Sequence, residues 1–213
     1  MPRTLILKDT QPIAKGKSRL VFQHPDEPDL IIKVMRPEVI EDRFGAGTKW
    51  YKRRRRYGKY VSYIREIQEY IAVHAKHNDD LPFLQEIIGF AKTDLGLGLV
   101  LKAIQNQDGT LSPTLAMLIK EHRLDDTILQ ALSTCLDQLL NCDVIVSDIN
   151  LGNLVYQERD GQPSRFILID GIGNNTPLPF KAISRRINRK SKLGRFAKLY
   201  NRIERAKKAN RHP

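Results

Sequence analysis

The spacing of apolar residues changes near residue 104, and this change limits which folds the 213-residue chain can adopt. Up to that point, short apolar runs closed by turn residues are typical of strands. We predict four strands, of which the first two form a hairpin, at residues 20–22, 30–35, 86–91 and 97–104. Helical spacing of the apolar residues predicts one helix among them, over residues 61–76. Residues 41–60 are polar and densely basic, and we predict a loop or the start of a solvated helix there.

Beyond residue 104 the pattern becomes mainly helical. Ser112 and Pro113 suit the N-terminus of a helix over residues 112–121, with Ser112 as the cap and Pro113 at the first position. A longer helix is predicted from residue 127 to about residue 141, with Asp125 or Asp126 as its cap.

A second hairpin follows the longer helix. Two short apolar runs, residues 154–156 and 166–169, are separated by the turn dipeptide Asp160-Gly161. A strand-rich part with one helix is thus followed by a helical part with one hairpin. This order predicts an α+β fold of two lobes, residues 1–104 and residues 105–213.

A polar loop between the longer helix and the second hairpin contains Asp148 and Asn153, five positions apart. The protein-kinase catalytic loop has this spacing, and there the Asp faces the acceptor hydroxyl while the Asn binds magnesium. Asp170 ends the last strand of the hairpin, from where its carboxylate can bind a metal ion. Turn-forming Asx residues would explain each residue alone, but not their joint order. We therefore interpret Asp148 as the catalytic candidate and Asn153 and Asp170 as magnesium ligands.

A nucleotide site of this kind also needs a cation for the α- and β-phosphates. Lys33 lies inside an apolar strand and is our candidate, the alternative being an exposed lysine on an edge strand. Its carboxylate partner on the following helix would be Glu66 or Glu69, and we favour Glu66.

The loop before Lys33 is the candidate for covering the phosphates. It has one glycine, Gly16, where the usual loop has three. With Lys17 and Ser18, Gly16 would bring backbone N–H groups toward phosphate.

In this order, the residues resemble those of the protein-kinase-like superfamily. More specifically, the chain is similar to the bacterial PhoP regulatory network protein family, and the resemblance covers nearly the whole chain. It rests on six short segments, namely residues 14–19, 32–34, 65–67, 93–98, 153–155 and 170–173. It implies a reduced two-lobed kinase-like fold that uses ATP and Mg²⁺ as cofactors. It also implies a link to a stress-response regulon.

The sequence departs from protein kinases at several places. Ser147 stands where kinases usually have Arg before the catalytic Asp, and the glycines after Asp170 lie at positions 171 and 173. A long activation segment and peptide-docking helices are absent from the pattern. We therefore expect a phosphotransferase acting on a small molecule, a lipid or a glycan. The alternative is a pseudokinase that binds nucleotide or a partner without catalysis.

The C-terminal segment carries the charge. Residues 181–213 hold 13 lysine or arginine residues against one glutamate, which accounts for the whole net charge of +12. Apolar residues recur within it at near-helical spacing, which favours a pair of helices with a solvated basic face. The alternative is a segment that binds an anionic membrane surface or RNA.

The remaining sequence features suggest a cytoplasmic protein. Cys135 and Cys142 lie about 10 Å apart on one predicted helix, too far for a disulfide, so we expect two buried thiols. An N-terminal signal peptide and a long apolar membrane-spanning stretch are not expected from the pattern.

Overall fold

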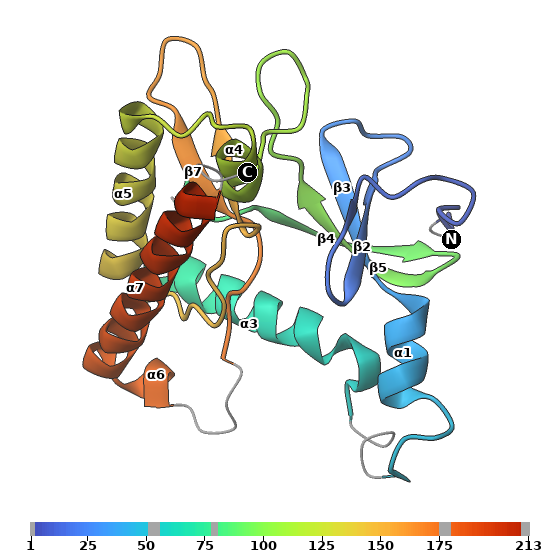
Figure 1. Cartoon of the computed structure of the whole chain (residues 1–213). Helices are drawn as coiled ribbons and strands as arrows, with labels where there is room; N and C mark the ends of the chain where they lie inside the picture. The colour runs from blue at the N-terminus through green and yellow to red at the C-terminus, as the bar shows by residue number, and fades with distance from the viewer. Residues whose placement is uncertain (1–2, 51–55, 78–80, 175–179, 210–213) are drawn as a thin grey trace. The chain divides into compact units, whose positions relative to one another are not determined.

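The computed structural model describes residues 3–50, 56–77, 81–174 and 180–209 (Figure 1). The chain forms two compact units. The first contains Met1–Ile64 and Glu86–Ala103, and the second contains Arg65–Gln85 and Ile104–Pro213. Residues 65–85 therefore group with the C-terminal half. A division into two domains at residues 104 and 105 stays a prediction.

A five-stranded antiparallel sheet forms the first unit, in the order β1-β2-β3-β5-β4. Its strands are β1 (Ala14–Lys15), β2 (Arg19–Gln23), β3 (Leu30–Met35), β4 (Ile87–Thr93) and β5 (Gly96–Lys102). The predicted hairpin is confirmed by the pairing of β2 with β3. The central position of β3 matters for the site, because it places Lys33 in the middle of the sheet.

The two faces of β3 have different neighbours, as alternation along a strand requires. Leu30, Ile32 and Val34 belong to a buried cluster with residues of the chain's N-terminus and of β2 and β5. Lys33 faces the other way. Tyr63 donates from its hydroxyl to the Lys33 carbonyl at 2.8 Å, and its ring lies 6.2 Å from that of Phe90.

Within the described residues, one short helix and a 3-10 turn precede the main helix of this region. Helix α1 (Pro37–Phe44) was not predicted, because we interpreted Pro37 only as the end of a strand. Proline also suits the first turn of a helix, where its missing N–H costs nothing. A 3-10 turn, η1 (Gly58–Tyr60), leads into α3 (Val61–His77), which confirms the helix predicted over residues 61–76.

The second unit is mainly helical, with one two-stranded sheet. Its elements are α4 (Leu115–Lys120), α5 (Asp126–Asn141), β6 (Leu154–Gln157), β7 (Arg165–Leu168), α6 (Phe180–Ile183) and α7 (Arg185–Ala209). One apolar core joins α4, α5, the β6–β7 hairpin and α7. Both predicted helices and the hairpin are present, and the α+β class is confirmed.

The caps of the two helices show where local pattern succeeds and fails. Asp125 caps α5 by accepting the N–H of Ile128 at 2.8 Å, which decides between the two candidates. The cap predicted for the earlier helix was wrong, because Thr114 takes that role. Ser112 instead donates to Asn106, and its backbone N–H bonds the Ile104 carbonyl. These contacts hold the chain out of the helix until Thr114.

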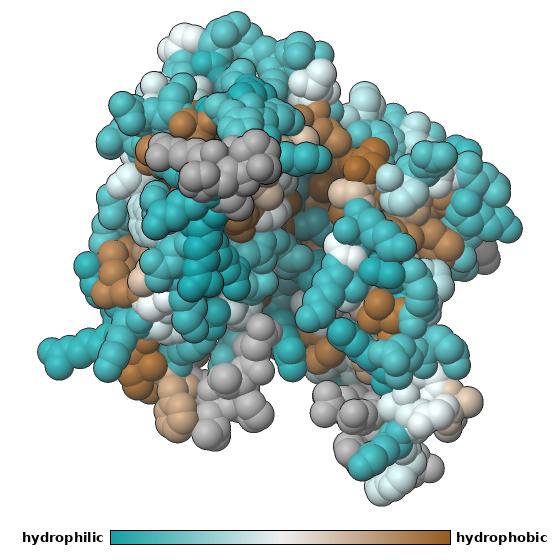
Figure 2. All heavy atoms as spheres, viewed as in Figure 1, coloured by the Kyte–Doolittle hydropathy of each residue, from teal (hydrophilic) through white to brown (hydrophobic). Residues whose placement is uncertain are grey.

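The C-terminal segment is a helix pair, as predicted, and part of it is core. Phe196, Leu199 and Ile203 are buried. Ile183, Ile187 and Tyr200 of the predicted apolar stripe are exposed. Figure 2 shows mainly hydrophilic residues over α7, with hydrophobic ones at its end next to α6. Two polar residues, Asn188 and Lys192, are buried on the side of α7 that faces the core.

Two other expectations concern the cysteines and the membrane. Cys135 and Cys142 are both buried and free, as predicted. Burial raises the pKa of the Cys135 thiol to about 12, so it stays protonated. Of the helices in the described residues, none has the length and apolar character needed to cross a membrane.

Candidate functional site

The loops that carry Asp148 and Asp170 are joined by hydrogen bonds to the Gly171 carbonyl. Gly171 accepts hydrogen bonds from the backbone N–H of Ser147 at 2.7 Å and of Asp148 at 3.1 Å. The Ser147 hydroxyl donates to the same oxygen at 2.9 Å. The N–H of Gly173 bonds the Ile145 carbonyl at 2.8 Å, so the segments run antiparallel here. The structure thus brings together two predicted residues that are 22 positions apart in the sequence.

Asn153 joins the same group. Its Nδ2 donates to the Asp148 carbonyl at 3.3 Å, and its own carbonyl accepts the N–H of Ile169 next to Asp170. The Asp148 carboxylate is exposed and accepts a hydrogen bond from Asn150 Nδ2 at 2.9 Å. Asp170 accepts the N–H of Gly171 at 2.7 Å. Asp148, Asn153 and Asp170 therefore all lie within one hydrogen-bonded pair of loops.

Two glycines make this close approach possible. Gly171 has φ +87° and Gly173 has φ +95°, a backbone region that residues with a side chain rarely adopt. A Cβ at Gly171 would overlap the Asp148 carbonyl, and one at Gly173 would lie 2.7 Å from the Arg65 carbonyl oxygen. The glycine positions that differ from those of protein kinases thus have a steric reason in this chain.

The donor set suits magnesium. The Asp170 carboxylate and the Asn153 amide offer hard oxygen atoms, and Mg²⁺ is commonly held by one or two carboxylates together with substrate phosphates. Since Asn153 uses its Nδ2 on the Asp148 carbonyl, its oxygen is the atom that remains for a ligand. In the described residues there is no group of three or more His, Cys, Asp or Glu side chains placed to hold a metal. A closed protein-only metal centre is therefore not part of the described structure.

Lys33 is not the exposed edge lysine of the alternative interpretation. Its side chain is 4% exposed, and β3 is the central strand of the sheet. Lysine is rarely buried without a charged or polar partner. The role of Lys33 in contacting phosphate stays a prediction.

The two glutamates proposed as partners of Lys33 differ in their surroundings. Glu66 and Glu69 are both buried. Both belong to the second unit, and the Oε1 of Glu69 accepts the backbone N–H of Ile145 there at 2.6 Å. Burial raises the pKa of its carboxyl. The choice of Glu66 over Glu69 as the partner of Lys33 stays a prediction.

The glycine loop is the tip of the β1–β2 hairpin. The Gly16 N–H closes the turn by bonding the Arg19 carbonyl at 2.9 Å. Arg36 donates to the carbonyls of Gly16 and Lys17 at 3.1 and 3.4 Å. A phosphate contact from backbone N–H groups in this loop would therefore rest on Lys17 and Ser18.

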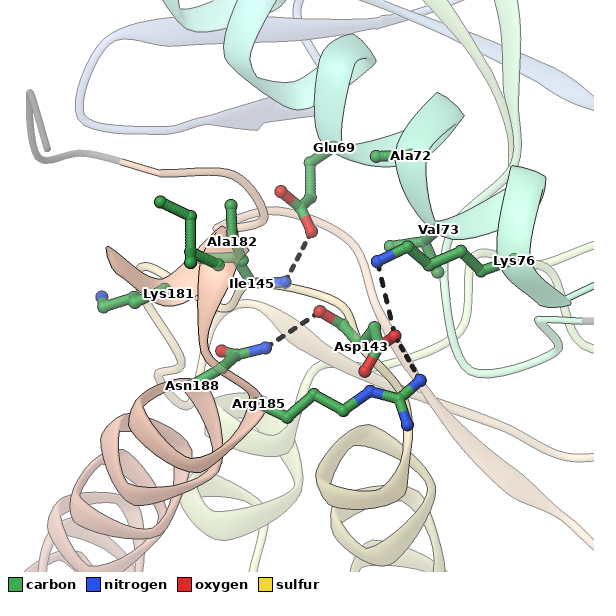
Figure 3. A pocket seen from close by; sticks show the side chains of 11 residues that line it. Glu69, Ala72, Val73, Lys76, Asp143, Ile145, Lys181, Ala182, Arg185 and Asn188 are labelled. Carbon is green, nitrogen blue, oxygen red and sulfur yellow. Dashed lines mark hydrogen bonds and ion pairs between the residues drawn. The ribbon is translucent and has the colours of Figure 1, made fainter. Parts of the chain in front are cut away.

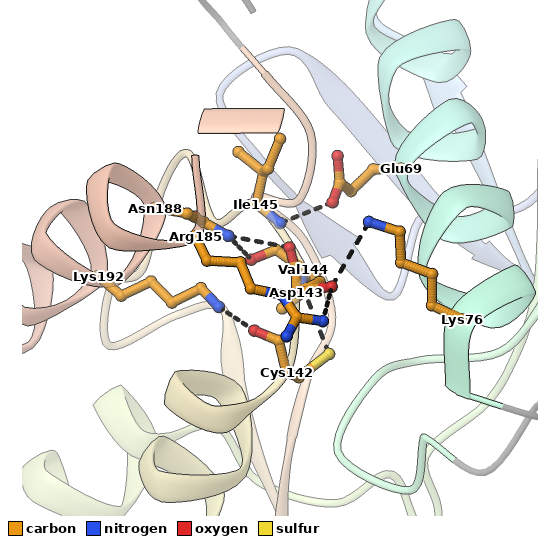
Figure 4. A network of polar contacts seen from close by, with 9 residues as sticks. All are labelled: Glu69, Lys76, Cys142, Asp143, Val144, Ile145, Arg185, Asn188 and Lys192. Carbon is orange, nitrogen blue, oxygen red and sulfur yellow. Dashed lines mark hydrogen bonds and ion pairs between the residues drawn. The ribbon is translucent and has the colours of Figure 1, made fainter. Parts of the chain in front are cut away.

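Sequence reasoning missed a polar network around residues 142–145, the segment that leads to the Asp148 loop (Figure 4). Lys192 of α7 is 1% exposed and donates to the carbonyls of Leu139 and Cys142 at 2.6 and 2.5 Å. These carbonyls end α5, where a cation is favoured by the helix dipole. Asp143 pairs with Arg185 at 2.8 Å and with Lys76 at 3.5 Å. The available signal was spacing, because Lys192 lies four and seven positions before Phe196 and Leu199, which are buried on the same side of α7.

Comparison with known proteins identifies the family of this chain. The family model described as PhoP regulatory network protein YrbL matches residues 5–204. This chain belongs to that family. The comparison with curated proteins gives no match.

Solved structures give a more distant likeness. The chain is similar to the kinase domain of PknI from Mycobacterium tuberculosis in two double-mutant forms. For one, the identity is 16% and the TM-score 0.45, over 76% of this chain and 56% of that chain. For the other form, the identity is 16% and the TM-score 0.46, over 82% of this chain and 65% of that chain. The family member described here therefore spans less than two thirds of those kinase domains.

Proposed function

We propose that the chain is an ATP- and magnesium-dependent phosphotransferase acting on a small-molecule, lipid or glycan acceptor. The observation that carries this proposal is the convergence of the Asp148 and Asp170 loops on the Gly171 carbonyl. Two carboxylates and an amide held this way provide the oxygen ligands and the acceptor-facing carboxylate of a phosphoryl-transfer site.

Each residue has a defined role in the proposal. Asp170 and Asn153 would hold magnesium, which would neutralise charge on the transferring phosphates. Asp148 would orient the acceptor hydroxyl and accept its proton. Lys33 would contact the α- and β-phosphates, and Glu66 would be its carboxylate partner. Positioning and electrostatic stabilisation would supply most of the rate enhancement.

The alternative is a regulatory protein that binds nucleotide without turnover. The family description refers to the PhoP regulatory network, and we extend membership of such a stress-response regulon to this chain as part of the proposal. Regulation of this kind is compatible with either function, so the decision rests on binding and turnover.

The first prediction concerns nucleotide binding, measured as the change in melting temperature with ATP, with and without magnesium. Saturating Mg-ATP at about 100 times its Kd should stabilise the folded state by about 2.7 kcal/mol, which raises Tm by several degrees. Asp170→Asn should lose the magnesium-dependent part of this shift. Asp137→Asn, an exposed aspartate on α5, is the matched control. Absence of any shift in the natural sequence would refute the nucleotide site.

The second prediction separates catalysis from binding. Asp148→Asn should keep the thermal shift with Mg-ATP but lower ADP release by about 10² or more, the usual contribution of a positioned general base. If the natural sequence binds Mg-ATP and releases no ADP with any acceptor class, the regulatory alternative is correct.

A further inference from the structure

A pocket of about 630 Å³ lies in the second unit. Its walls come from α3, from the segment leading to the Asp148 loop, from α6 and from the start of α7 (Figure 3). Its polar side chains are Glu69, Lys76, Asp143, Lys181, Arg185 and Asn188. The predicted phosphotransferase residues Asp148, Asn153 and Asp170 do not line it.

The pocket is lined by three basic side chains and two acidic ones. Asp143 pairs with both Lys76 and Arg185, which lowers the pKa of its carboxyl. Lys181 is a third cation, and among the described residues it forms no ion pair. Burial and the nearby charge of Arg195 both lower the pKa of Lys181. The charged forms of two neighbouring cations such as Lys181 and Arg195 repel each other in a partly desolvated environment, and a bound anion reduces this repulsion.

Asn188 contributes an acceptor that receives no hydrogen bond from the described residues. Its Nδ2 donates to the carbonyls of Asp143 at 2.9 Å and Val144 at 3.1 Å, which fixes the orientation of the amide. The side chain is 4% exposed, and within the described residues its Oδ1 receives no hydrogen bond. In Figure 3 this oxygen points away from Asp143. A buried acceptor without a donor costs about 1–3 kcal/mol, so native structures usually satisfy it.

We propose that this pocket binds a small oxyanion that keeps an O–H group, as hydrogen phosphate does at neutral pH. Lys181 would supply the charge that the anion needs, with Arg185 and Lys76 at the same pocket. Asn188 Oδ1 would accept the O–H of the ligand, which must displace neighbouring side chains because the atom is buried. A fully deprotonated anion such as sulfate satisfies the cations but offers nothing to Asn188.

The site does not depend on the proposed phosphotransferase activity. The test is isothermal titration calorimetry of the whole chain with inorganic phosphate and with sulfate, at matched ionic strength and without nucleotide. Phosphate should bind at least about tenfold more tightly than sulfate, which corresponds to about 1.4 kcal/mol. Lys181→Met should weaken phosphate binding by at least about tenfold. Lys198→Met, an exposed lysine of α7 outside the pocket, is the matched control.

Two further arms make the outcome decisive. Asp170→Asn should leave phosphate binding unchanged, because Asp170 does not line this pocket. A change in phosphate affinity in this variant would mean that phosphate binds at the predicted nucleotide site instead. Melting temperature and circular dichroism establish that Lys181→Met is folded. Equal phosphate binding by Lys181→Met and the natural sequence, or no saturable phosphate binding at all, would overturn the site. Equal affinity for sulfate and phosphate would overturn the role of Asn188.

Discussion

Replacing Gly171 with alanine is expected to destabilise the protein by about 3 kcal/mol or more, a large effect for a single methyl group. Two costs add at this position. The backbone has φ +87°, where a side chain is strained, and the new Cβ would overlap the Asp148 carbonyl. The overlapping atom belongs to backbone that is itself held by hydrogen bonds to the Gly171 carbonyl, so it cannot move aside without breaking them.

Gly161→Ala provides the matched control for this prediction. Gly161 also has positive φ, at +64°, but nothing lies within 4 Å of the position its Cβ would take. Its substitution should cost only the backbone strain, about 1 kcal/mol. Urea unfolding of both variants measures the difference. Equal free energies of unfolding for Gly171→Ala and Gly161→Ala would show that the two loops do not approach each other as described.

The sequence revealed the candidate residues of the site but not the contact at Gly171 that brings them together. Asp148, Asn153 and Asp170 were found from their order and spacing, because kinase-like loops preserve both. Spacing could not reveal that the Gly171 carbonyl receives three hydrogen bonds from the Asp148 loop. That contact depends on how the β6–β7 hairpin folds back, which no local pattern records.

Helices with strong apolar periodicity were predictable because the pattern lies within their own segment of the sequence. Helix α5 places its apolar residues at helical spacing and is capped by Asp125, so it is determined within its own segment. Helix α1 has eight residues and none of them is buried, so its apolar pattern was too short to predict a helix. Thr114 replaced Ser112 as a cap because Ser112 is used by Asn106 and Ile104, which are contacts between segments.

Lys192 is the clearest case of a residue whose role depends on tertiary contacts. In the sequence it is one of 13 basic residues in the C-terminal segment. In the fold its ammonium group reaches the last carbonyls of α5, far from it in the chain. Neighbouring positions of α7 bury Phe196 and Leu199, so a lysine on this side must enter the core with them.

Lys192→Met is expected to lower the free energy of unfolding by about 3 kcal/mol at high pH, because two buried carbonyls lose their donor. The loss should shrink as the pH falls. Burial lowers the pKa of Lys192 in the folded protein to about 8, from an ordinary value of 10.5. Between these two values the unfolded chain binds a proton that the folded protein does not, so the contribution of Lys192 to stability rises with pH.

The margin between the natural sequence and Lys192→Met should therefore grow by about 2 kcal/mol between about pH 7.5 and about pH 9.5. Urea unfolding of both proteins at the two pH values measures it, and titration of other groups cancels in the difference. Lys198→Met controls for the loss of a lysine from the exposed side of α7. A margin that stays constant or falls with pH would mean that the ammonium form is retained in the core. In that case the two carbonyls and the helix dipole outweigh the desolvation of the charge.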